Sequence, residues 1–225
     1  MRQVFARRRG SDRLLLIFGG WGMDERLIDL SSAVGEGVDV MLCYDYRSMS
    51  FDASPLAGYR SLHLLAWSMG VWVAGRVLGG MTLPWAGRVA FNGTPFPMDD
   101  VRGIPVSVFE GTLRGFSETV LAKFRRRMCG SGDALRLFME RAPQRTVEEL
   151  HGELQALHDA VLVAEGSHTL QWDLAVVGLR DRIFPPANQL AAWQDVAEVR
   201  TVDAAHYDAA VMKHLIETDL TWTRN

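Results

Sequence analysis

LHLLAWSMGVWVA, residues 62–74, decides how the rest of the chain is interpreted. An apolar run typical of a buried strand stops at Ser68, and a run compatible with a helix follows at once. Small residues, Ala66 and Gly70, lie two positions before and after the serine. This pattern is typical of a nucleophile elbow, a strained strand-to-helix turn in which bulky side chains at those positions clash.

The five-residue pattern by itself leaves two interpretations open. The elbow is usually written Gly-x-Ser-x-Gly, and Ala66 stands in the place of the first glycine. The pattern small-x-Ser-x-small also occurs by chance, and in that case Ser68 is an ordinary N-cap at the start of a helix. The catalytic interpretation therefore needs partners for the serine elsewhere in the sequence.

Composition and charge describe one globular domain and exclude several classes of protein. The chain has 225 residues, 48% of them hydrophobic and 23% charged, with a formal net charge of −3. This charge gives no indication of nucleic-acid binding. The N-terminal segment has no apolar core of the signal-peptide type, and no run approaches the ~20 apolar residues of a membrane span. We therefore expect a cytoplasmic protein.

The two cysteines indicate neither a metal site nor a disulfide framework. Cys43 and Cys129 are far apart in sequence and have no zinc-type spacing. In a reducing compartment they are expected as free thiols, and a single disulfide is the alternative.

Apolar runs of strand length alternate with helical patterns along most of the chain. The predicted strands are 14–18, 38–44, 61–66, 88–91, 175–178 and 198–202. The predicted helices between them are 24–34, 69–78, 186–194 and 209–219. This alternation predicts an α/β fold with a mostly parallel central sheet and helices on both faces.

The middle of the chain departs from the alternation. Residues 117–128, 132–141 and 146–162 have helical spacing and few β-branched residues. We therefore predict a helical insertion, residues 113–165, within a single domain that spans residues 1–225. Because open α/β sheets bind ligands beyond the carboxyl ends of their strands, we expect the insertion to form a lid above that edge.

Candidates for the partners of Ser68 follow two of the predicted strands. A serine nucleophile gives its proton to a histidine, which a carboxylate orients, and in this kind of fold the chain order is serine, acid, histidine. Asp181 follows the strand at 175–178, and His206 follows the last predicted strand. Since the carboxyl ends of parallel strands meet at one edge of a sheet, we expect all three residues to meet there.

Other acids and histidines are weaker candidates. Asp203 and Asp208 flank His206 and are rivals to Asp181, but a close neighbour on the same loop seldom reaches the far ring nitrogen at the correct angle. The remaining histidines are expected to be packed or on the surface: His63, His151, His158, His168 and His214.

The loop after the first predicted strand is rich in glycine. Residues 19–23 are Gly-Gly-Trp-Gly-Met, and glycine lets a backbone approach a reacting carbonyl closely. An oxyanion hole needs two N–H donors, and the N–H groups of Met69, directly after the serine, and Trp21 are the natural pair. The alternatives are a simple turn and a phosphate-binding loop, but the loop lacks the Lys-Ser/Thr of a P-loop.

Several segments carry a narrower resemblance. They are Phe18–Met23, Ala66–Val71, Phe91–Pro95 and the strand and loop around Gly103–Pro105. With these motifs the chain resembles the DUF452 family, which includes BioG-like pimeloyl-acyl carrier protein methyl ester esterases of the α/β-hydrolase superfamily. The resemblance to an α/β-hydrolase extends over nearly the whole chain.

The resemblance implies a function and a set of site residues. It implies hydrolysis of pimeloyl-acyl carrier protein methyl ester to pimeloyl-acyl carrier protein and methanol in biotin biosynthesis. It implies a catalytic triad of Ser68, Asp181 and His206. It also implies an oxyanion hole formed by Trp21 and Met69, and this chemistry requires no metal and no organic cofactor.

A carrier-protein substrate predicts a basic docking surface, because an acyl carrier protein is acidic. The candidates within the insertion are Lys123, Arg125, Arg126 and Arg127, and a solvated helix face is the alternative. Two other functions stay open. One is a general carboxylesterase or thioesterase with a different acyl group, and the other is a non-catalytic binding protein that keeps the hydrolase fold.

Overall fold

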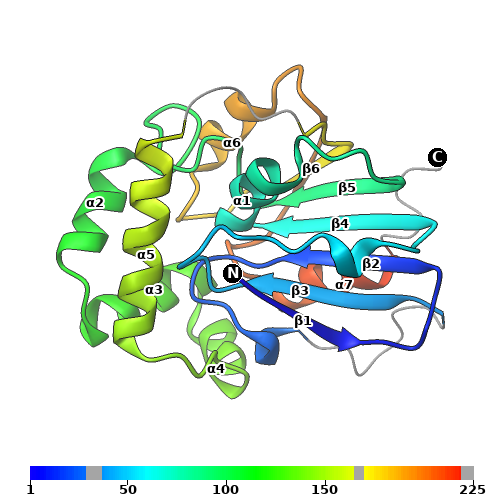
Figure 1. The fold of residues 1–225 in the computed structure, drawn as a ribbon. Helices are drawn as coiled ribbons and strands as arrows, with labels where there is room; N and C mark the ends of the chain where they lie inside the picture. Colours follow the sequence, from blue (N-terminus) through cyan, green and yellow to red (C-terminus); the bar gives the residue numbers. More distant parts are fainter. Residues whose placement is uncertain (29–36, 165–169, 219–225) are drawn as a thin grey trace.

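A seven-stranded sheet forms the centre of the molecule, with strand order β1-β3-β2-β4-β5-β6-β7 (Figure 1). The structure, a computed structural model, describes residues 1–28, 37–164 and 170–218. The strands are β1 (Arg2–Arg7), β2 (Arg13–Phe18), β3 (Asp39–Tyr44), β4 (Ser61–Trp67), β5 (Trp85–Phe91), β6 (Leu174–Gly178) and β7 (Glu198–Val202). Every pair is parallel except β1 with β3.

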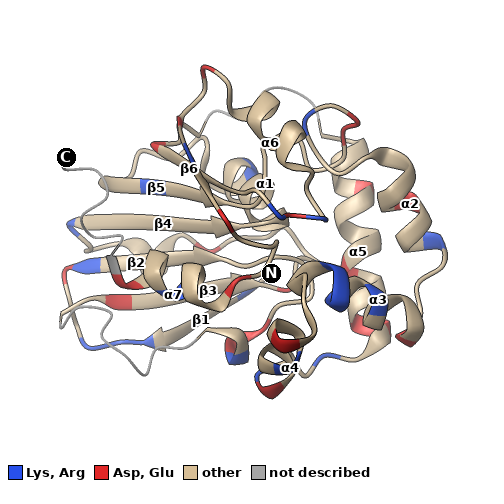
Figure 2. Cartoon of the chain, turned by 180° about the vertical axis from the view of Figure 1, so that it is seen from behind, with Lys and Arg blue, Asp and Glu red and all other residues tan. Residues whose placement is uncertain are grey.

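The central strands are buried on both faces, which explains why they are continuous apolar runs in the sequence. In β2, Leu14 to Phe18 are at most 1% exposed, and β4 is equally buried from Leu62 to Ala66 apart from His63 at 4%. Two helices of the sheet layer, α1 (Met69–Leu78) and α7 (Ala209–Thr218), lie on opposite faces (Figures 1 and 2). The prediction of a mostly parallel sheet flanked by helices is confirmed.

The helical insertion enters between β5 and β6 and lies beyond the carboxyl ends of the parallel strands (Figure 1). Its helices are α2 (Val106–Arg114), α3 (Glu118–Cys129), α4 (Gly132–Glu140) and α5 (Val147–Leu162). The remaining helix of the sheet layer is α6 (Pro186–Trp193), and two short 3-10 helices are η1 (Glu25–Leu27) and η2 (Ser54–Leu56). A capping box formed by Thr146 and Glu149 starts α5.

Two elements were not predicted, and one prediction cannot be followed to its end. The antiparallel edge strand β1 is absent from the predicted list, and α2 starts the insertion at Val106, before the expected residue 113. Of the helix predicted at 24–34, the structure shows η1, and 29–36 lie outside the described residues, as do 165 and 219. In the described part of the chain, no helix combines the length and apolarity needed to cross a membrane.

Candidate active site

Ser68 occupies a sharp turn between β4 and α1. Its backbone has φ 59° and ψ −129°, a strained conformation for a residue other than glycine. Neighbouring backbone segments leave no room for larger residues. A Cβ on Gly70 would lie 2.4 Å from the carbonyl oxygen of Phe18, and a Cβ on Gly93 would lie 2.3 Å from the carbonyl oxygen of Ser68. Ala66 is fully buried within β4, so its methyl group is accommodated. The local geometry is that of a nucleophile elbow.

The structure brings Ser68, His206 and Asp181 together at the carboxyl edge of the sheet. Nε2 of His206 lies 2.9 Å from Oγ of Ser68, and Nδ1 of the same ring lies 2.8 Å from Oδ2 of Asp181. Asp181 follows β6 and His206 follows β7, as the sequence predicts. All three residues are buried, with exposed fractions of 5% or less. The arrangement can pass a proton from a serine hydroxyl to an oriented imidazole.

The carboxylate of Asp181 is held at both oxygens. Oδ1 accepts from the N–H groups of Ile183 and Phe184 at 2.7 and 3.0 Å, while Oδ2 accepts from Nε2 of Gln189 at 3.0 Å as well as facing His206. Gln189 is fully buried on α6. Gln189 was not predicted from the sequence, although a glutamine on the apolar face of the helix next to the acid loop indicates a buried polar contact.

A second residue that the sequence analysis did not assign holds the histidine loop. Asn92, in the strained turn after β5, donates from Nδ2 to the carbonyl oxygens of Ala205 and His206 at 2.9 and 3.0 Å. Its Oδ1 accepts from the N–H of Gly178 at 2.7 Å. Asn92 therefore joins the loops that carry Asp181 and His206, which gives a physical role to the segment Phe91–Pro95.

The rival acids and the other histidines lie apart from this arrangement. Asp203 pairs with Arg180 at the surface, and Asp208 accepts from backbone N–H groups at the start of α7. The other described histidines are a buried residue in β4, two that stack on phenylalanines, and one exposed on α7: His63, His151, His158 and His214. His168 lies outside the described residues. Among the described residues no cluster is suited to holding a metal ion.

Trp21 and Met69 carry the backbone N–H groups that the sequence predicts as oxyanion donors, and both residues line the cavity over Ser68. Met69 is the first residue of α1, where helix N–H groups lack partners within the helix. The loop carrying Trp21 passes so close that a Cβ on Gly20 would lie 3.1 Å from Cβ of Ser68. Within the described part of the chain neither N–H is engaged by a backbone or side-chain acceptor. Both N–H groups are thus free to donate to a bound substrate.

A cavity, partly open to solvent, lies over Ser68 and His206. Its walls are mostly apolar and come from the elbow, the glycine loop, the acid loop and helices of the insertion. Apolar lining residues are Trp21, Trp67, Met69, Ile104, Val108, Phe109, Phe124, Met128, Leu154 and Ile183. Thr112 and Arg127 are the other polar residues of the lining. Such a cavity suits an apolar acyl chain.

The four basic residues considered for docking do not share one location. All lie on α3, which carries a basic band in Figure 2. Arg127 lines the cavity over Ser68, whereas Arg125 and Arg126 line a separate groove beside α4 and the start of α5. Lys123 and Arg126 are exposed, and Arg125 is half-buried near the ring of Phe138, where burial lowers the pKa of its guanidinium.

Cys43 and Cys129 are both buried and free, as the first of the two alternatives predicts. Burial raises the pKa of the Cys129 thiol to about 11 and also raises that of Cys43. Both side chains are therefore neutral thiols near pH 7.

Comparison with known proteins identifies relatives of the chain. A Bacteroides fragilis protein named malonyl-[acyl-carrier protein] O-methyltransferase is 49% identical over 200 residues, which are 88% of this chain. The chain spans only 40% of that relative's length. The crystal structure of BioG from Haemophilus influenzae superposes with a TM-score of 0.88 at 36% identity, covering 95% of this chain and 97% of the other.

More distant structures have the same fold. An esterase from Exiguobacterium antarcticum superposes with a TM-score of 0.71 at 12% identity, over 100% of this chain and 94% of the other. The protein thus has the fold of a hydrolase. The profile of the family described as pimeloyl-ACP methyl esterase BioG matches residues 1–218. The chain therefore belongs to the BioG family of pimeloyl-ACP methyl esterases.

Proposed function

We propose that this chain is a serine carboxylesterase that hydrolyses pimeloyl-[acyl-carrier protein] methyl ester to pimeloyl-[acyl-carrier protein] and methanol in biotin biosynthesis. The observation that carries the proposal is the hydrogen-bonded series from Ser68 through His206 to Asp181, below an apolar cavity. Family membership supplies the substrate, and the geometry supplies the reaction class.

In the first half of the reaction Ser68 attacks the ester carbonyl. Nε2 of His206 takes the hydroxyl proton as the Oγ–C bond forms, and Asp181 stabilises the imidazolium through Nδ1–H. The tetrahedral intermediate collapses when the bond to the methoxy oxygen breaks. His206 gives its proton to that oxygen, and methanol leaves an acyl-enzyme on Ser68.

In the second half water attacks the acyl-enzyme. His206 removes a proton from the water, a second tetrahedral intermediate forms, and its collapse returns that proton to Oγ of Ser68 and releases the free carboxylic acid, which then loses its remaining proton to solvent. The N–H groups of Trp21 and Met69 stabilise the oxyanion in both halves. Removing one such donor typically costs about 10²–10³ in kcat.

The helical insertion acts in this proposal as the lid and as the carrier-protein contact. Helices α2, α3 and α5 supply cavity residues, so the insertion determines which acyl chain reaches Ser68. Arg127 is exposed and lines the cavity, which suits it to the phosphate of a carrier's prosthetic arm. Lys123, Arg125 and Arg126 extend the basic surface of α3 toward an acidic partner.

The test compares wild type with Ser68→Ala on a short p-nitrophenyl ester and on the carrier-bound methyl ester. We expect Ser68→Ala to lose at least ~10³-fold in kcat on both substrates and to lose labelling by a fluorophosphonate probe. Wild-type turnover by this variant would remove Ser68 from the mechanism. A folded wild-type protein that the probe leaves unlabelled would favour a binding protein instead.

Carrier dependence is tested by charge reversal. Arg127→Glu should raise KM for the carrier-bound ester at least tenfold, at ~1.4 kcal/mol per tenfold, and leave the p-nitrophenyl ester within about threefold. Arg200→Glu is the matched control, since Arg200 lies on β7, in the sheet away from α3. Equal kcat/KM for carrier-bound and free methyl ester would instead indicate a general carboxylesterase.

A further inference from the structure

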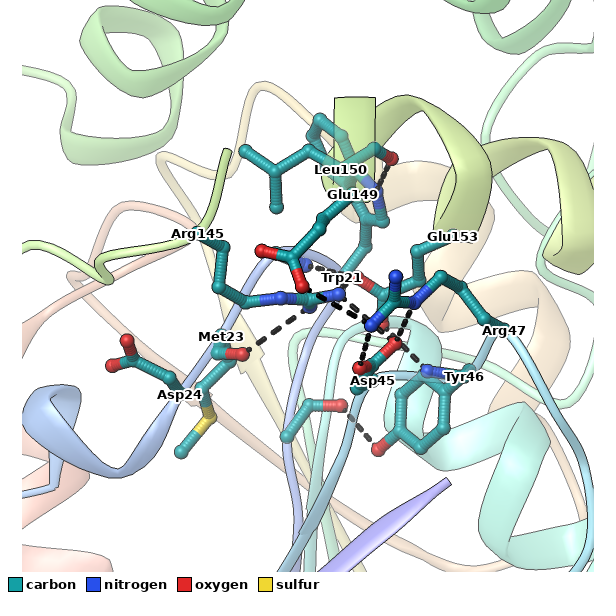
Figure 3. A network of polar contacts seen from close by, with 12 residues as sticks. Trp21, Met23, Asp24, Asp45, Tyr46, Arg47, Arg145, Glu149, Leu150 and Glu153 are labelled. Atoms are coloured by element: carbon teal, nitrogen blue, oxygen red, sulfur yellow. Dashed lines mark hydrogen bonds and ion pairs between the residues drawn. The ribbon is translucent and has the colours of Figure 1, made fainter. Parts of the chain in front are cut away.

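A buried carboxylate on the insertion reaches the glycine loop that carries Trp21 (Figure 3). Glu153 lies on α5 and is fully buried. Its Oε2 accepts from the N–H of Gly22 at 3.1 Å and from Nη1 of Arg145 at 2.6 Å, while its Oε1 accepts from the N–H of Tyr46 at 2.9 Å. One side chain thus joins α5, the segment after β3 and the loop after β2.

The charged side chains around Glu153 are paired with one another. Arg145 is only 4% exposed, and its Nη2 lies 3.0 Å from Oδ1 of Asp45. Burial raises the pKa of Glu153, and Arg145 acts in the opposite direction. Burial likewise acts to raise the pKa of Asp45, but Arg47 and Arg145 hold it below its usual range. Since a buried ion pair adds little net stability, the main effect of this group is to fix positions.

Groups outside the glycine loop form hydrogen bonds with Gly19, Trp21 and Gly22. Tyr46 donates its hydroxyl to the carbonyl oxygen of Gly19 at 2.7 Å. Nε1 of Trp21 donates to the carbonyl oxygen of Leu150 on α5 at 2.9 Å. The N–H of Gly22, whose φ is +76°, is held by Glu153. The conformation of the loop therefore depends on contacts with α5 and Tyr46 as well as on its own glycines.

We infer that Glu153 is a positioning residue for the oxyanion hole, an inference that rests on the proposed function. The N–H of Trp21 belongs to the Gly20–Trp21 peptide, and Glu153 holds the next peptide, Trp21–Gly22. A shift of Gly22 therefore moves the Cα of Trp21, which the two peptides share, and the donor moves with it. A misplaced donor lowers the stabilisation of the transition state more than it lowers the binding of the substrate, because the oxyanion exists only after attack. Glu153 thus makes the insertion a supporting part of the hole as well as a wall of the cavity.

The test is Glu153→Gln, with Glu149→Gln as the matched control. A glutamine keeps the size of the side chain but turns an NH₂ group toward one of the backbone N–H groups that donate to the carboxylate in the wild type. Glu149 lies one turn earlier on α5, where its contacts are with Arg47 and the helix start, and glutamine serves equally well in a capping box.

The assay uses p-nitrophenyl butyrate, with active sites counted by fluorophosphonate end-point labelling of Ser68. Per active site, Glu153→Gln should lower kcat about 10- to 100-fold with KM within about threefold, since loss of a whole donor costs about 10²–10³. Its affinity for a trifluoromethyl ketone, which forms an oxyanion on Ser68, should fall in parallel with kcat/KM. Glu149→Gln should stay within about twofold of wild type.

Wild-type kcat per active site in Glu153→Gln would overturn the inference, and so would a loss explained wholly by fewer titratable sites. If Glu153→Gln does not fold, Arg145→Lys is the second test variant. It replaces the guanidinium group that bridges Glu153 and Asp45 with a single ammonium group. It should show the same fall in kcat at unchanged KM, and wild-type kcat would refute the inference. Failure of the proposed function is distinct, because it appears as turnover by Ser68→Ala.

Discussion

Replacing Asp181 with asparagine removes a charge and forces a change of tautomer that the structure allows us to follow. The Oδ1 position faces two backbone donors, the N–H groups of Ile183 and Phe184 at 2.7 and 3.0 Å. An asparagine must place its oxygen there, because an NH₂ group would oppose both donors. Its NH₂ group then takes the Oδ2 position, opposite His206 and Gln189.

The new NH₂ group can be satisfied only if both neighbours accept. Gln189 can accept only by turning its amide, because its Oε1 has no partner in the described part of the chain. This turn gives up the bond from its Nε2 to the carbonyl oxygen of Phe184 at 2.8 Å. Nδ1 of His206 must then accept, which moves the ring proton to Nε2. That nitrogen faces Oγ of Ser68 at 2.9 Å and, once protonated, cannot take the serine proton.

We therefore expect Asp181→Asn to lower kcat about 10⁴-fold, equivalent to ~5.5 kcal/mol, with KM nearly unchanged. The assay is turnover of p-nitrophenyl butyrate near pH 7.5, with circular dichroism and the melting temperature to show that the fold is intact. Asp208→Asn is the control, since Asp208 lies two residues after His206 but caps α7. A loss of less than tenfold in Asp181→Asn would refute the tautomer argument.

Three further predictions follow from other contacts. Gln189→Met removes one donor to Asp181 at similar volume and should lower kcat about tenfold at constant KM; an unchanged kcat would show that the backbone donors suffice. Gly70→Ala places a Cβ against the Phe18 carbonyl and should cost about 3 kcal/mol, measured by urea denaturation, whereas Gly80→Ala, with open space, should cost at most about 0.5 kcal/mol. Because burial raises the pKa of Cys129 to about 11, its thiol is protonated at pH 8, and Ellman's reagent should modify the native protein at least ~10-fold more slowly than the unfolded chain; equal rates would contradict this.

The sequence was sufficient for the residues that follow strands. Ser68, Asp181 and His206 each follow a predicted strand within a few residues, and parallel topology brings such positions to one edge. Their meeting therefore needed no knowledge of side-chain packing. By the same reasoning the glycine loop and the start of α1 were expected beside the serine.

The supporting residues could not be predicted in this way. Asn92 and Glu153 act through contacts with segments 86 to 131 residues away along the chain. Gln189 contacts Asp181, 8 residues before it, from a helix position with no local pattern. Their partners are mostly backbone groups, which leave no trace in the amino-acid sequence. A polar residue on a buried helix face is the signal that remains.

The missed elements have physical reasons. The edge strand β1 pairs on one side alone and is flanked by Arg2 and Arg7, so it lacks the apolar run of a central strand. Helix α2 begins with Val106 and Val108, and β-branched residues weaken the helical pattern. Both elements form because tertiary contacts override local preference.

The bond between Glu153 and the glycine loop limits how new substrate preferences can be engineered. Exchanging α2–α5 for the corresponding segment of another esterase is an attractive route, because the insertion supplies much of the cavity wall. A transplanted segment that lacks an acceptor for the N–H groups of Gly22 and Tyr46 would bring a new cavity together with a displaced oxyanion donor. Chimeras of this enzyme should therefore carry the Glu153 position and its Arg145 partner along with any new helices.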